Sequence, residues 1–245
     1  MVVRILSCFL LTALAAASAK TVTVWTENFA GGRLDLNRWQ LTTDGDFREW
    51  DVSVAAVPAR AGAFRLGLSA DTQRTRDDTA KFVGARRISP IRLDGEVRVS
   101  VDLDWNKQSN GSYLSAAVVL SPYATVESPL KLADWLKIEY VGVPPGTNAR
   151  MVIGLRRGGQ ERTLYNEGWP ETNRAGRTIG LQHLVIVLHD QNVQVLENDR
   201  LVYASKQRMA DFGSAFLYLQ MSSHSNYPRR TVYFGDIRVE EERNR

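Results

Sequence analysis

The sequence has a single cysteine and only three histidines in 245 residues. Cys8 lies in the apolar stretch at the N-terminus, so the rest of the chain can form no disulfide and has no thiol nucleophile. His183, His189 and His224 lack the spacing of zinc ligands. A Gly-x-Ser-x-Gly sequence is also absent, and with it the signature of an α/β-hydrolase nucleophile. Disulfide stabilisation and these three kinds of catalysis are therefore disfavoured.

The chain also lacks long apolar runs after residue 20, helical periodicity and internal repeats. Its one extended apolar run follows Arg4 and ends in Ala17-Ser18-Ala19, a pattern that is typical of a secretory signal peptide over residues 1–19. We therefore expect a protein that is secreted or periplasmic and has no membrane insertion. Residues 20–240 are expected to form one β-sandwich domain, followed by a polar tail at 241–245.

Charge of neither sign is concentrated. The 31 basic and 27 acidic residues give a net charge of +4, and without a basic run nucleic acid is not an expected partner. Arginine outnumbers lysine by 25 to 6. This excess reflects either genomic base composition or an acidic glycan ligand, because arginine binds carboxylate and sulfate in bidentate fashion. We expect a monomer.

What the sequence does contain is alternation of apolar and polar residues with period two. From Val97 to Trp105, every second residue is apolar, and turn signals such as Asn110-Gly111 and Gly158-Gly159 separate segments of this kind. The alternation predicts strands at residues 97–105, 113–120, 135–141, 150–155, 183–188, 193–196, 201–204, 216–222 and 231–239. So many short strands without disulfides predict an all-β fold, a two-sheet antiparallel sandwich of jelly-roll type.

Several stretches carry a resemblance to a known group. WTENFAGGRLDLNRW and VYFGDIRV resemble the first and last strands of the concanavalin A-like lectin/glucanase superfamily, particularly glycoside hydrolase family 16. ISPIRLDGEVRVSVDLDW and SYLSAAVVLSP stand where that family has the strands ahead of its catalytic strand. HLVIVLHDQNVQVLENDRLVY resembles the hairpin pair of laminin-G-like members. The resemblance spans the chain after residue 19 and implies a concanavalin A-like sandwich.

The catalytic strand of the resembled family reads Glu-x-Asp-x-x-Glu and supplies a nucleophile, an assisting Asp and an acid/base. WLKIEYVG, residues 135–142, falls at that place, but its same-face residues are Trp135, Lys137 and Glu139. Retaining hydrolysis needs two carboxyl groups about 5 to 5.5 Å apart. The family's mechanism therefore does not carry over, and we assign no catalytic residue.

The alternate polar residues of several strands are predicted to form a binding face instead. In AFLYLQMSSHSNYPRR, alternate apolar residues point to the core and leave Tyr218, Gln220 and His224 in one row. Such a row is costly when buried without partners and suits a wet sugar-binding groove, where aromatic rings pack against sugar C–H groups. The carbohydrate-binding set predicted for one concave sheet is Asp102, Asp104, Trp135, Glu139, Tyr218, Gln220 and His224, with Trp169 at a rim loop.

These patterns predict a secreted, lectin-like protein that binds a polysaccharide or other glycan on a concave sheet without covalent catalysis. The alternative is a divergent glycoside hydrolase or a polysaccharide lyase, since Tyr218 or His224 offers a base, and Gln220 and Arg98 offer groups to neutralise a uronate. A structural or adhesion protein without a glycan ligand is the third possibility.

The resemblance also implies a structural calcium ion between the opening and closing strands, held by backbone carbonyls and one carboxylate. Asp236 in VYFGDIRV matches the carboxylate position, and Glu27 in WTENF lies on the opening strand. Calcium takes six to eight oxygen ligands, so one or two carboxylates with carbonyls and water suffice. The alternative is that Asp236 merely terminates a strand or pairs with Arg238 or another nearby arginine. No cofactor is expected to be required.

Overall fold

The computed structural model describes residues 20–58, 60–75, 79–105, 114–142, 148–170, 180–205, 212–224 and 226–243. The predicted signal peptide, residues 1–19, lies outside this set. Within it the regular structure consists of sixteen strands and one 3-10 turn, η2 (Pro129–Lys131). No helix in the described residues is long and apolar enough to cross a membrane. The prediction of a nearly helix-free all-β chain is confirmed.

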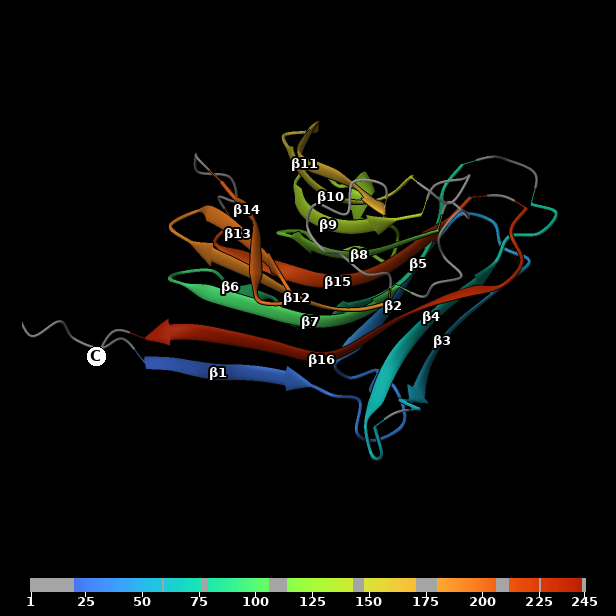
Figure 1. Cartoon of the computed structure of the whole chain (residues 1–245), viewed down its shortest axis with the longest axis horizontal. Helices are drawn as coiled ribbons and strands as arrows, with labels where there is room; N and C mark the ends of the chain where they lie inside the picture. The colour runs from blue at the N-terminus through green and yellow to red at the C-terminus, as the bar shows by residue number, and fades with distance from the viewer. Residues whose placement is uncertain are drawn as a thin grey trace, which may run out of the picture.

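The strands form two antiparallel sheets that enclose one core (Figure 1). Sheet A contains, in order, β14 (Arg200–Ala204), β13 (Asn192–Glu197), β12 (Gly180–His189), β7 (Val97–Trp105), β16 (Arg230–Arg243), β4 (Phe64–Asp71) and β3 (Glu49–Ala56), with β1 (Lys20–Glu27) beside β16. Sheet B contains β11 (Gln160–Pro170), β10 (Asn148–Arg157), β9 (Trp135–Val141), β8 (Leu114–Ser121), β15 (Ser214–Ser223), β5 (Lys81–Arg87) and β2 (Trp39–Asp44), with β6 (Ile91–Arg92) beside β15. The predicted jelly-roll sandwich is confirmed.

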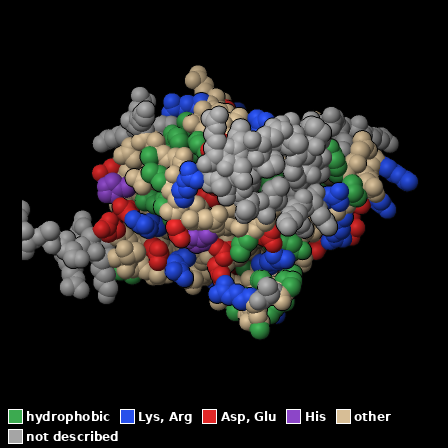
Figure 2. Space-filling model, in the orientation of Figure 1, with side chains coloured by type: hydrophobic (Ala, Val, Ile, Leu, Met, Phe, Trp, Pro, Cys, Tyr) green, Lys and Arg blue, Asp and Glu red, His purple; other side chains and the backbone are tan. Residues whose placement is uncertain are grey.

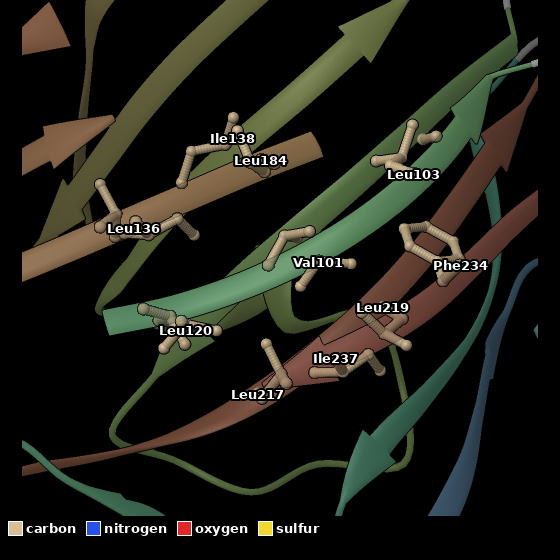
Figure 3. Packing of buried hydrophobic residues seen from close by; sticks show 14 of the residues in the cluster. Val101, Leu103, Leu120, Leu136, Ile138, Leu184, Leu217, Leu219, Phe234 and Ile237 are labelled. Carbon is tan, nitrogen blue, oxygen red and sulfur yellow. The ribbon is translucent and has the colours of Figure 1, made fainter. Parts of the chain in front are cut away.

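The core lies between the two sheets and follows the predicted alternation. Figure 3 shows Val101 and Leu103 of β7 clustered with Leu217 and Leu219 of β15 and with Phe234 of β16. All five side chains are fully buried. Each such side chain contributes roughly 1.5–3 kcal/mol relative to an exposed one, so burial supplies the stabilisation that disulfides supply in many smaller domains.

Three two-residue turns fix the register of neighbouring strands. Asp190-Gln191 joins β12 to β13, Asn198-Asp199 joins β13 to β14, and Gly158-Gly159 joins β10 to β11. Both residues of each turn have positive φ, the conformation of the turns that match strand twist. Asn, Asp and Gly tolerate this conformation better than other residues, so these sequences favour hairpins at these places.

Strand β16 pairs with three other strands of sheet A. It pairs with β7 along one edge, and with β4 and then β1 along the other. Its pairing with β1 extends to Arg243, which lies opposite Lys20. The polar tail expected at 241–245 is thus strand as far as Arg243. Backbone hydrogen bonds to β1 form there whatever the polarity of the side chains. The polar composition of this segment therefore does not reveal that it is a strand.

Candidate functional site

Strand β9, at the place of the resembled catalytic strand, has one carboxylate on its outward face. Lys137 pairs with Val119 of β8, and Glu139 pairs with Ala117 of the same strand. The Lys137 Nζ and a Glu139 carboxylate oxygen are 2.8 Å apart, and each side chain is 12% exposed. Lys137 also lies 5.5 Å from the Trp135 ring centroid. An ammonium group therefore neutralises the carboxylate where the family strand would need a second acid.

Residues 122–134, which we call the strap, connect β8 to β9 and cross the outer face of sheet B. At one side the Thr43 N–H of β2 donates to the Val126 carbonyl, at 3.0 Å, and Lys131 pairs with Asp44 at 2.7 Å. At the other side Arg156 of β10 donates to the Leu130 carbonyl at 2.9 Å. The strap is therefore attached to strands near opposite edges of the sheet.

A small apolar cluster lies beneath the strap. It consists of Ala117 and Val119 of β8, Trp135 of β9 and Tyr218 of β15, with Leu130 and Leu132 of the strap packed on it. The indole N–H of Trp135 donates to the Leu130 carbonyl at 3.3 Å. Trp135 is 1% exposed. The ring predicted to stack on a sugar is covered by the chain itself.

The Tyr218 hydroxyl holds the first half of the strap. It donates to the Tyr123 carbonyl at 2.8 Å and accepts from the Thr125 N–H at 2.9 Å. Burial raises the pKa of this phenol above its ordinary value, although the Thr125 hydrogen bond and the charge of Arg86 act in the opposite direction. Gln220, two residues further, is 2% exposed and lies 3.4 Å from the Ser128 hydroxyl. Both residues serve as attachment points of the strap.

The predicted binding set is divided between the two sheets. Trp135, Glu139, Tyr218 and Gln220 share the outer face of sheet B, as predicted. The prediction that Asp102 and Asp104 lie on the same sheet is wrong, because their strand β7 belongs to sheet A. Alternation along a strand fixes which side chains share a face, but it carries no information on which of two sheets the strand joins.

The remaining two members of the set, His224 and Trp169, lie at the C-terminal ends of two strands of sheet B. His224 directly follows β15, outside the strand. Trp169 lies within β11, opposite Ala149, and not in a rim loop as predicted. The structure describes the backbone of Trp169 but not its side chain. Whether any of the eight residues binds carbohydrate stays a prediction.

The outer face of sheet A brings together polar residues that lie far apart in the sequence. An Asp102 carboxylate oxygen lies 2.7 Å from His183 Nδ1, and Asp104 accepts from Arg65 at 2.6 Å. The Arg65 guanidinium lies over the Tyr233 ring, 3.6 Å from its centroid. Figure 2 shows acidic, basic and histidine side chains interspersed on the face turned to the viewer. Arg65 and Tyr233 were not predicted, because only the pairing of β4 with β16 makes them neighbours.

Solved structures match the chain although no family model and no curated protein does so significantly. The CBM2 module of the evolved Dit of Lactobacillus casei BL23 phage J-1 superposes with a TM-score of 0.61 at 10% identity, over 93% of this chain and 98% of that one. The catalytic domain of an endo-1,3-β-glucanase (laminarinase) from Thermotoga petrophila RKU-1 gives 0.57 at 16% identity, over 92% and 100%. LamAcat from Zobellia galactanivorans gives 0.58 at 14%, over 89% and 97%. The chain has a concanavalin A-like, glucanase-like fold.

Within this concanavalin A-like fold the two candidate calcium ligands point to opposite sides of sheet A. Glu27 lies opposite the core residue Ile237 and is itself buried, whereas Asp236 is exposed. Asp236 forms an ion pair with Arg60 at 2.8 Å. The described residues contain no group of three or more His, Cys, Asp or Glu side chains that could hold a metal ion. As arranged, the two carboxylates do not fit one shared ion.

Calcium binding at Asp236 stays a prediction, and it requires Arg60 to leave this carboxylate. An ion bound only by the native state raises the melting temperature with its concentration. We therefore predict that calcium raises the melting temperature of chelator-treated protein, and that Asp236→Ala abolishes the increase. Melting curves at several calcium concentrations measure this. Superimposable wild-type curves with and without calcium would contradict the prediction and leave the Arg60 ion pair as the role of Asp236.

Proposed function

We propose that this protein is a carbohydrate-binding protein without covalent catalysis. The fold supports it, since solved structures with the same fold over about nine-tenths of the chain include a CBM2 module and the catalytic domain of an endo-1,3-β-glucanase. A likeness at 10–16% identity concerns the fold, so the absence of catalysis has to be argued from strand β9. The signal-peptide pattern of residues 1–19 supports export to a compartment in which polysaccharides are available.

One observation carries the choice of binding over hydrolysis. The outward face of β9 holds Glu139 in an ion pair with Lys137. Retaining hydrolysis uses two carboxyl groups about 5–5.5 Å apart, and one of them must take up a proton to act as acid. Here the one carboxylate is engaged by the Lys137 ammonium group at 2.8 Å. The outward face of the strand therefore offers no second carboxyl group for this chemistry.

The test compares retention with product release. The exported form of the protein and its Glu139→Gln variant are screened against laminarin, a mixed-linked β-1,3-1,4-glucan and alginate, with Glu49→Gln as a control at an exposed glutamate. We expect retention on a glucan, and reducing-end release no higher than the blank for all three proteins. Affinity electrophoresis measures retention, and a reducing-sugar assay measures release.

The other outcomes identify the competing functions. Release by the wild type that disappears in Glu139→Gln and persists in Glu49→Gln would establish a divergent glycoside hydrolase. Absorbance of unsaturated chain ends from alginate would establish a polysaccharide lyase. Neither retention nor release on any of the three polymers would contradict the proposal in favour of a structural or adhesion role.

A further inference from the structure

The outer face of sheet A contains a hollow of about 400 Å³. Its floor contains Tyr233, Asp104 and Leu181, which are paired across three strands, and the neighbouring pair of Gly235 and Asp102. Val57, Arg60 and Ala63, which lie between β3 and β4, form one wall. Ligand pockets typically enclose roughly 300–1,000 Å³ and combine apolar walls with a few convergent polar groups. The hollow has both properties.

Both arginines of the hollow already form ion pairs with aspartates. Arg65 and Asp104 are 2.6 Å apart, with 19% and 25% of their side chains exposed. Arg60 and Asp236 form a second pair at 2.8 Å at the rim. His183 Nδ1 lies 2.7 Å from an Asp102 carboxylate oxygen. A carboxylate or sulfate ligand would find each arginine engaged by an aspartate, so the arrangement favours a neutral ligand over an acidic one.

The apolar part of the hollow is open to solvent. Leu181 is 62% exposed beside Asp104. The ring of Tyr233 lies close to the backbone, because Gly67 has no Cβ and one built there would lie 3.2 Å from it. Gly235 likewise leaves the floor without a side chain between Arg65 and Asp102. Glycine at both positions therefore keeps space above the sheet that a larger residue would fill.

We propose that this hollow binds one end of a neutral saccharide. Asp102 and Asp104 each use one oxygen in the contacts with His183 and Arg65, and a carboxylate accepts further hydrogen bonds from sugar hydroxyls. The C–H face of the ring packs on Leu181, in the way that sugars use apolar surface. The inference rests on the proposed function and assigns it a place: the outer face of sheet A, since the strap occupies the centre of the opposite sheet's outer face.

The experiment uses laminarin-derived β-1,3-glucan oligosaccharides as neutral probes and alginate oligomers of equal length as acidic ones. Isothermal titration gives the dissociation constant for the wild type, Asp104→Asn, Leu181→Ala and Gly235→Leu. Leu201→Ala is the matched control, because Leu201 is an exposed leucine of the same sheet, on β14. Melting curves establish that each variant is folded, and Leu181→Ala keeps the test valid should Asp104→Asn or Gly235→Leu unfold.

We expect the neutral oligosaccharides to bind about tenfold more weakly to Asp104→Asn, because a lost charge-assisted hydrogen bond changes affinity by about this factor. Binding to Gly235→Leu should weaken about as much, because the leucine fills space in the hollow. Binding to Leu181→Ala should weaken severalfold, because apolar contact surface is lost. Leu201→Ala should bind as the wild type does. Unchanged affinity in all three hollow variants would overturn this site and leave the proposed function intact. Stronger binding of alginate than of glucan would overturn the neutral class. Failure of the wild type to bind any probe would overturn the proposed function and this site together.

Discussion

Trp135→Ala is expected to lower the free energy of unfolding by about 3–5 kcal/mol, the range for truncating a large buried aromatic side chain. The indole is 1% exposed under the strap, packs in the cluster with Tyr218, and donates to the Leu130 carbonyl. A ring on an open binding face would cost almost nothing to remove. Equilibrium denaturation in urea measures the difference.

Variants at Tyr218 separate packing from attachment of the strap. Tyr218→Ala should cost about as much as Trp135→Ala. Tyr218→Phe keeps the ring and loses only the hydrogen bonds to Tyr123 and Thr125, at a cost of about 1–2 kcal/mol. Trp50→Ala is the control, since Trp50 is an exposed tryptophan of β3. Wild-type stability in Trp135→Ala would show that the strap does not cover this face in solution.

Glu27→Ala is expected to cost about 2–4 kcal/mol, because removing one partner leaves buried donors without an acceptor. The Glu27 carboxylate accepts from the Phe29 N–H at 3.0 Å and from the Trp39 indole at 3.2 Å, and pairs with Arg38 at 3.1 Å. The network joins β1 to the start of β2 and to the loop between them. Urea denaturation in the presence of a chelator measures the loss without any contribution from calcium.

Asp236→Asn is the matched control for this second prediction. The sequence suggests Asp236 and Glu27 together as calcium ligands, but in the structure Asp236 forms an exposed ion pair with Arg60. Exposed ion pairs contribute about 0–1 kcal/mol to the free energy of unfolding. Asparagine tolerates the positive φ of 41° at this position. A Glu27→Ala variant as stable as Asp236→Asn would contradict the role assigned to the buried network.

Strands β7–β10 and β12–β16, with the core residues they carry, could be predicted from the sequence because each depends on local alternation. Val97 to Trp105 shows this most clearly, with every apolar member of β7 buried. The strap was missed although β8 carries a signal for it. Its sequence LSAAVVLS is apolar on both faces around Ala117 and Val119, and all eight residues are buried. A strand that is apolar on both faces indicates cover on both sides.

The hollow on sheet A could not have been predicted in this way. Arg65 and Asp104 are separated by 39 residues, and Tyr233 comes from the last strand. Their meeting depends on β16 lying between β4 and β7, which is a property of topology. The alternation of β7 correctly places Asp102 and Asp104 on the face turned away from the core, but their expected place beside β9 and β15 is wrong, because β7 belongs to sheet A.

The central position of β16 also determines the order in which sheet A can assemble. β3 and β4 form one antiparallel pair, and β7 with β12, β13 and β14 forms another group, but only β16 joins the two. During synthesis β16 emerges after the other fifteen strands. Until then β4, β7 and β1 each have an edge without the strand that pairs with it in the folded sheet. Its partner Lys20 lies at the far end of the sequence from Arg243, and pairing across such separations is slow. Folding of this sandwich therefore completes only after translation of β16, and a chain that ends before Arg230 presents three strand edges to other molecules.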